Sequence, residues 1–211
     1  MNLKKIRNEI LKESKPYVVK YGWNDSLFVN ISKNSKFKYE EIKTLFPNGY
    51  EQLLQMYLDD VNNNMTIEAA KINLIRLRVH ERIKELIIIR LRLFLKEKKL
   101  INKTFLYLLI PTNYKLASKN LYKTVDQMWF IAGDNSSDFN FYSKRAILAS
   151  IYTTVMIHFV NNENIDKTIL FLSKQLKRVA QIPKIKNRAN DFFNLIPQIL
   201  KWKKNSSFFR R

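Results

Sequence analysis

Apolar residues recur at intervals of three or four positions along most of the chain, and this spacing predicts α-helices. Apolar and polar residues do not alternate one by one, as they would in a β-strand, over any long stretch, so we expect no β-sheet. The glycines Gly22, Gly49 and Gly133 each fall at a break between helical patterns. The pattern predicts an all-α bundle of about nine or ten helices, without an internal repeat or a domain linker.

The breaks divide the chain into predicted helices over residues 2–21, 25–31, 37–45, 50–61, 66–99, 102–110, 116–132, 139–160, 165–181 and 191–202. Ser35 and Thr66 are the expected N-caps of the third and fifth of these helices. Residues 86–95 are apolar nearly all round, apart from Arg90 and Arg92. The helix over 139–160 is apolar around most of its axis, which is typical of a central, buried helix.

Composition narrows the chemistry that such a bundle can carry. The chain has 211 residues, no Cys and two His, which argues against disulfide scaffolds, cysteine catalysis and a multi-His metal site. No nucleophile stands beside a base, and no glycine-rich phosphate loop is present. We therefore expect a protein that is not an enzyme and that has no metal and no cofactor. His158, on an apolar helix, is expected to be a hydrogen-bonded core residue.

Positive charge is concentrated at the carboxyl end of the chain. The formal net charge is +20, and residues 167–211 hold twelve basic residues against the single acid Asp191. A local excess of this kind favours an anionic partner, either nucleic acid or an anionic membrane surface. No apolar run is long enough to span a membrane, and residues 1–13 lack the apolar core of a signal peptide. A bacterial cytoplasmic location is the expectation.

The first short helices resemble the helix-turn-helix part of TetR-type proteins, with residues 37–46 in the place of the recognition helix. Glu40 and Glu41 would face phosphate in its first turns, and DNA binding depends mainly on Lys and Arg contacts. DNA is therefore an unlikely partner. A TetR-type regulator that senses a hydrophobic ligand stays open as the alternative function.

The most specific segment covers residues 126–148 and reads DQMWFIAGDNSSDFNFYSKRAIL. Gly133 ends one predicted helix, a polar turn follows, and Asp138 is the expected N-cap of the next helix. Lys144 and Arg145 would lie close enough to pair with Asp134 or Asp138. On local chemistry alone this is a well-capped connection between two helices.

The same segment resembles the signature of the Coq-nine family of ubiquinone biosynthesis, in its α-proteobacterial form. The matching residues are Trp129, Ala132, Gly133, Asp134, Ser137, Asp138, Phe141, Tyr142, Lys144 and Arg145, with Phe141 where the family has Trp. Weaker matches lie at Gly22 and Trp23, at 45–47 and at 109–113. The resemblance covers roughly residues 15–180.

The resemblance implies a TetR-like all-α fold that binds isoprenoid lipid or phospholipid instead of DNA. It implies a non-enzymatic accessory protein that holds an isoprenoid quinone intermediate and presents it to the di-iron demethoxyubiquinone hydroxylase. It also implies a homodimer that is peripheral on the inner face of the cytoplasmic membrane. The hydroxylase-contacting patch falls by position on Phe141 and Tyr142, with Met128 and Trp129 as weaker candidates.

The last predicted helix is amphipathic and basic. Its apolar half and neighbouring lysines are typical of a helix lying on an anionic membrane. The expected membrane contacts are Phe192, Phe193, Ile196, Ile199, Leu200, Trp202, Lys203 and Lys204. Docking of this helix on its own bundle or on a second subunit is the alternative. We predict a lipid-binding domain over 1–182, with 1–62 as its vestigial helix-turn-helix part, and a basic amphipathic segment over 183–211.

Overall fold

The computed structural model describes residues 3–136 and 139–181. These residues form nine α-helices and no β-strand, so the all-α prediction is confirmed. The helices are α1 (Leu3–Tyr21), α2 (Leu27–Asn34), α3 (Tyr39–Leu45), α4 (Gly49–Ala70), α5 (Val79–Leu95), α6 (Lys98–Leu109), α7 (Tyr114–Ile131), α8 (Phe139–Asn161) and α9 (Ile165–Gln181). Two short 3₁₀ turns cover Leu74–Arg76 and Pro111–Asn113.

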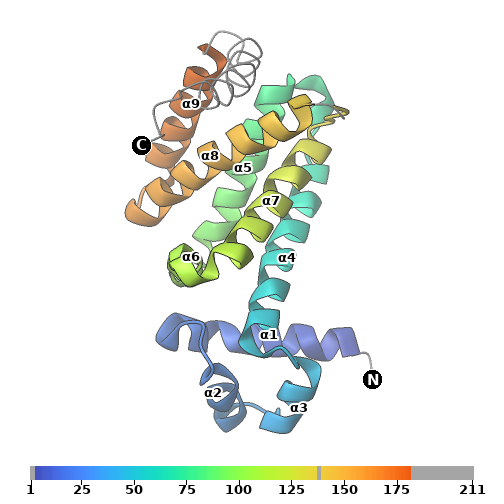
Figure 1. Cartoon of the computed structure of the whole chain (residues 1–211), viewed down its shortest axis with the longest axis vertical. Helices are drawn as coiled ribbons and strands as arrows, with labels where there is room; N and C mark the ends of the chain where they lie inside the picture. Colours follow the sequence, from blue (N-terminus) through green and yellow to red (C-terminus); the bar gives the residue numbers. More distant parts are fainter. Residues whose placement is uncertain (1–2, 137–138, 182–211) are drawn as a thin grey trace, which may run out of the picture. The chain divides into compact units, whose positions relative to one another are not determined.

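The chain divides into two compact units, Met1–Ser173 and Lys174–Arg211, and all the packing described below lies in the first. In this unit α1, α2 and α3 pack on one another, and α4 runs from them into the bundle (Figure 1). There α4 packs on α5 and α7, and α7 packs on α8. Of the second unit the structure describes the last turns of α9.

Helix α5 supplies much of the bundle core. Its residues 86–91 are all buried, including Arg90, as are Ile83 and Phe94. Each Leu or Ile side chain removed from water stabilises the fold by about 1.5–3 kcal/mol. The apolar run predicted from the sequence is therefore confirmed as core, while Arg92 is exposed and Arg90 is not.

Two polar contacts attach the first helices to the bundle. The indole Nε1 of Trp23, which follows α1, donates to Thr104 Oγ1 of α6 at 3.0 Å, and both side chains are buried. Lys15 Nζ of α1 lies 2.6 Å from Glu97 Oε1 at the start of α6. Because one contact ends on α6 and the other at its start, this helix links the amino-terminal group to the rest of the bundle.

The single helix predicted over 66–99 is wrong. Thr66 lies inside α4, where its hydroxyl donates to the Asn62 carbonyl at 3.2 Å, so it caps nothing. The chain leaves the helix after Ala70, and α5 begins only at Val79, where the carboxylate of Glu81 accepts the Arg78 backbone N–H at 2.8 Å. The prediction rested on apolar residues at helical spacing, which continue through this stretch, but one of them, Ile75, is 85% exposed.

Two further predictions are corrected. Ser35 is not the N-cap of α3: its hydroxyl accepts the Phe37 N–H at 3.1 Å in the preceding turn, and α3 begins at Tyr39. Helix α8 is not buried all round. Ile157 is exposed in the part of the chain that the structure describes, although Tyr152 and Phe159 on the same helix are buried.

The glycine breaks are confirmed, and two of them allow a matched test. Gly22 and Gly133 have φ values of +80° and +82°, a left-handed conformation that costs a residue with a Cβ free energy. A Cβ on Gly22 would meet nothing within 4 Å, whereas one on Gly133 would lie 3.2 Å from Arg82 Nη1. Arg82 in turn bonds the carbonyls of Ile75, Leu77 and Ala132.

We expect Gly22→Ala to lower the free energy of unfolding by about 1 kcal/mol, the cost of the backbone conformation alone. Gly133→Ala should cost more, because Arg82 must also move from the carbonyl that it binds. Urea unfolding of both variants measures the difference. Equal losses would show that Arg82 does not constrain this turn.

Candidate functional site

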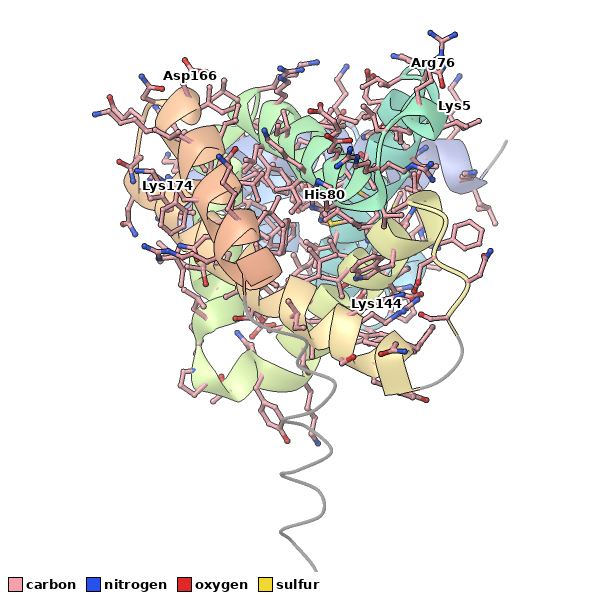
Figure 2. The ribbon with its side chains drawn as sticks, turned by 90° about the horizontal axis from the view of Figure 1, so that it is seen from above. Lys5, Arg76, His80, Lys144, Asp166 and Lys174 are labelled. Atoms are coloured by element: carbon pink, nitrogen blue, oxygen red, sulfur yellow. The ribbon has the colours of Figure 1, made fainter. Side chains whose placement is uncertain are left out.

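The specific segment of the sequence forms the corner between α7 and α8, centred on the carboxylate of Asp134. Lys144 Nζ lies 2.7 Å from Asp134 Oδ1, and Arg145 Nη1 lies 3.2 Å from Oδ2. Arg145 Nε also lies 2.6 Å from Asp126 Oδ1 on α7. Figure 2 shows Lys144 on the segment where α7 and α8 meet. The predicted pairing with Asp134 is confirmed, and the pairing with Asp126 was not predicted.

The environment of Asp134 favours its charged form. Burial on its own would raise the pKa of this carboxyl, but hydrogen bonds from Lys144, Ser136 and Arg145 outweigh that effect. Together they lower the pKa from 3.8 to about 2. Because its side chain is only 3% exposed, the carboxylate acts as a structural counterion for two cations and is not available to solvent.

Aromatic rings pack against the same ion pairs. The guanidinium of Arg145 lies 3.2 Å from the ring centre of Phe141, and Lys144 Nζ lies 5.5 Å from that of Trp129. Trp129 Nε1 also donates to the Lys144 carbonyl at 3.2 Å. Gly133, Asp134, Arg145 and these rings therefore form one connected unit that fixes the angle between α7 and α8.

The predicted partner patch divides into exposed and buried members. Tyr142 is 66% exposed, and its ring lies edge-on to that of Phe141. Trp129 and Phe141 are half-buried. Met128 has no exposed area, so its assignment to a surface patch is wrong. The exposed Phe130, which was not predicted as part of the patch, lies beside Trp129 in the chain.

Asp138 and the predicted membrane contacts at 192–204 lie outside the described residues.

A cavity of about 370 Å³ opens between α4, α5, α6, α7 and α8. Most of its lining is apolar, and none of these residues was predicted from the sequence to line a pocket. The apolar lining consists of Leu58, Phe94, Ile101, Phe105, Leu108, Leu109, Ile110, Pro111, Ala117, Leu121 and Met156. The only hint in the sequence was the apolar stretch over 105–111, which is more apolar than a short surface helix requires.

Arg90 lies on the cavity wall together with Thr124 and Tyr152, and all three are buried. Its Nε donates to Tyr152 Oη at 2.6 Å and its Nη1 donates to Asn62 Oδ1 at 2.5 Å. Burial raises the pKa of the Tyr152 hydroxyl, so this group is neutral and can donate a hydrogen bond. The cavity thus combines apolar walls with one small polar region.

Possible metal ligands were compared across residues 3–136 and 139–181. There, no three His, Cys, Asp or Glu side chains are placed to hold a metal ion. His158 bonds Thr168 Oγ1 at 3.0 Å and stacks on Phe171, as predicted for a hydrogen-bonded residue, but it is half-buried and does not belong to the core. None of the described helices is both long enough and apolar enough to cross a membrane.

The part of the chain that contains the α7–α8 corner is similar to known proteins. The family model described as COQ9 matches residues 114–183. The ubiquinone biosynthesis protein COQ9, mitochondrial, of Bos taurus is 24% identical over 168 residues, which are 76% of this chain and 52% of the relative. The protein of that name from Homo sapiens is 24% identical over 199 residues, which are 90% of this chain and 58% of the relative. The chain is similar in sequence to these COQ9 proteins.

The protein of that name from Rattus norvegicus is 42% identical over a shorter stretch of 59 residues, which are 28% of this chain and 19% of the relative. The chain spans between half and three fifths of the length of the bovine and human COQ9 proteins. The crystal structure of the TetR transcriptional regulator from Nitrosomonas europaea ATCC 19718 superposes with a TM-score of 0.69 at 19% identity, over 84% of this chain and 99% of that chain. This likeness confirms the TetR-like fold.

The ion pairs at the corner predict a specific effect of Asp134→Asn. The neutral side chain leaves Lys144 and Arg145 without their shared counterion, so we expect the free energy of unfolding at pH 7 to fall by about 2–3 kcal/mol. Because the folded pKa of Asp134 lies below its ordinary value, its charge stabilises the fold above pH 3.8 and this stabilisation is lost as the pH falls toward about 2.

Urea unfolding of both proteins across this pH range measures the effect. The difference between wild type and Asp134→Asn should shrink as the pH falls from 4 to 2, whereas a constant difference would contradict the assignment. Asp166→Asn, at an exposed position near the start of α9, is the control for removing one acid.

Proposed function

We propose that the chain is a non-enzymatic accessory protein of ubiquinone biosynthesis that binds a polyprenylated intermediate. The observation that carries this proposal is the cavity of about 370 Å³ with apolar walls. Its volume is within the range of known ligand pockets, and each methylene moved from water into it contributes about 0.8 kcal/mol. The COQ9 relatives, which are named ubiquinone biosynthesis proteins, support the choice of an isoprenoid ligand.

The size of the cavity limits what it can enclose. It has room for a ring and a few isoprene units, so a long prenyl tail would have to leave through the opening. We place the opening beside the lining residues Leu109, Ile110 and Tyr114, because all three are exposed. An apolar rim of this kind suits a protein that takes its ligand from a membrane and keeps the tail in contact with it.

Ala117→Phe fills the cavity from the α7 side and tests the proposal. We expect a several-fold loss of prenyl lipid or phospholipid in the purified protein, because the added ring occupies space that a ligand needs. Mass spectrometry of lipids extracted from the full chain measures it. Ala70→Phe, at an exposed position on α4, is the matched control and should retain its lipid. Equal lipid in both variants, or no lipid in the wild type, would contradict the proposal.

Presentation of the ligand to the di-iron demethoxyubiquinone hydroxylase forms the second part of the proposal. The exposed Tyr142 stands on a rigid support, because Phe141 beneath it is held by Arg145. Exposed aromatic side chains on fixed backbone are typical anchors of protein interfaces. We propose that Tyr142, Phe141 and Trp129 form the contact surface for the hydroxylase.

Tyr142→Ala should weaken binding to the hydroxylase about tenfold, as expected for the loss of an aromatic anchor. Its effect on the free energy of unfolding should stay below about 1 kcal/mol, because the ring is mostly exposed. Calorimetric titration with the hydroxylase from the same organism measures the affinity. Tyr122→Ala, which removes an exposed tyrosine from α7, is the control. A parallel loss of stability and affinity for Tyr142→Ala would show that its ring belongs to the core.

The basic segment over 183–211 is proposed as the membrane-binding element, which would make the protein peripheral. Deletion of residues 192–211 should abolish flotation with vesicles containing anionic phospholipid, because each Lys or Arg near such a surface contributes about 1 kcal/mol. The helical signal in circular dichroism should persist. Equal flotation of full-length and truncated protein at moderate salt would contradict this role.

Several expectations stay predictions. The curated relatives named above are mitochondrial proteins by name, and the location at a bacterial cytoplasmic membrane, like the homodimer, is untested. DNA regulation is not proposed, although the N. europaea protein is a transcriptional regulator by its name. Glu40 and Glu41 are exposed on α3, where they would repel phosphate.

A further inference from the structure

Arg90 is a buried cation without a counterion. Its residue is 3% exposed, and it makes no ion pair with any carboxylate of the described chain. Its hydrogen-bond partners, Asn62, Thr124 and Tyr152, are all neutral. Arg145, the other buried arginine, has two carboxylate partners. The rings of Phe94 and Tyr152 lie 5.1 and 5.7 Å from the guanidinium, but no negative charge pairs with it. Because burying a charge is costly unless it is paired, a guanidinium without a counterion beside a cavity favours an anionic ligand there.

The guanidinium also has hydrogen-bonding capacity to spare. It carries five N–H donors, and three hydrogen bonds are found for it within the described residues, the longest to Thr124 Oγ1 at 3.4 Å. Tyr152 accepts from Arg90 Nε, so its own O–H is still able to donate, and Tyr152 is one of the residues that line the cavity. A ligand oxygen at this place could accept from Arg90 and from Tyr152 together.

Polar and apolar groups are distributed unevenly along the cavity. Most of its polar residues, namely Arg90, Thr104, Asn120, Thr124 and Tyr152, are buried, whereas Leu109, Ile110, Tyr114 and the polar Ser118 are exposed. A site that held a lipid with its head at the surface would show the reverse arrangement. This distribution suits an amphiphile that enters with its head first and leaves its tail in the opening.

We propose that the cavity selects amphiphiles with an acidic head, a carboxylic acid or a phenol, whose anionic oxygen pairs with Arg90 while the tail extends toward the opening. This inference rests on the proposed lipid-binding function and names the ligand class of the same cavity. Within that class it favours phenolic or carboxylated prenyl-aromatic compounds over fully neutral quinones.

Two matched pairs of probes test the selection on the full chain after removal of bound lipid. Dodecanoate is compared with dodecanol, and para-dodecylphenol with its methyl ether para-dodecylanisole. Isothermal titration calorimetry is run in about 0.3 M salt, which screens the surface lysines more than a buried charge. The acidic member of at least one pair should bind about tenfold more tightly, as expected for one charge-assisted hydrogen bond. The pair that shows the preference distinguishes a carboxylate from a phenolate head.

Asn62→Asp supplies the missing counterion without a change of shape. Asn62 Oδ1 already accepts from Arg90 and from Thr124, so an aspartate can keep both bonds. The variant should lose the preference for the acidic probe while its affinity for the neutral probe stays within about twofold. Asn63→Asp, the next residue on α4, is exposed and changes the net charge equally, so it should keep the preference. Arg90→Met, which should also lose the preference, is the second variant if Asn62→Asp does not fold.

The outcomes distinguish failure of the selection by Arg90 from failure of lipid binding by the cavity. If the neutral and acidic probes bind equally to the wild type, the cavity binds lipid and the selection by Arg90 is wrong. If Asn62→Asp keeps the preference, the selection arises elsewhere on this basic protein and the proposal is also overturned. If no probe binds and no lipid co-purifies, both the proposed lipid-binding function and the proposed selection of acidic heads are wrong.

Discussion

Four helices of the bundle meet at one buried guanidinium. Arg90 on α5 bonds Asn62 on α4, Thr124 on α7 and Tyr152 on α8, and every one of these side chains is buried. A charge in this position is tolerated only while its hydrogen bonds are kept, so the spacing of the four helices is constrained at this level of the bundle. Arg90, Thr124 and Tyr152 also line the cavity, and its walls are therefore set by a polar contact as well as by packing.

A second polar unit fixes the end of the bundle where α7 turns into α8. Asp134 is paired with Lys144 and Arg145, and Arg145 holds the ring of Phe141. The most specific segment of the sequence thus acts first as a structural clamp, and the exposed Tyr142 is a consequence of that clamp. The binding and presenting parts of the proposed function therefore rest on different side chains, which makes them separable by mutation.

Periodicity predicted most of the fold because apolar spacing reports burial directly. It failed between residues 66 and 79, where Ile75 follows the helical spacing but is exposed, and no Pro or Gly marks the end of α4. Pairing of Lys144 and Arg145 with Asp134 was predictable because the residues are close in sequence. The polar region of the cavity was not predictable from the sequence. Arg90 lies 28 residues from Asn62 and 62 from Tyr152 in the chain, and only the three-dimensional packing brings them together.

The central claim, that the cavity holds the lipid, is tested most directly by photoaffinity labelling. A long-chain alkyl probe carrying a diazirine is bound to the full chain, activated with light, and its attachment sites are mapped by mass spectrometry of peptides. The account predicts labels on Leu108, Leu121 and Met156, which line the cavity from three different helices, and their loss in the Ala117→Phe variant. Labels confined to residues outside the cavity lining, unchanged in that variant, would contradict it.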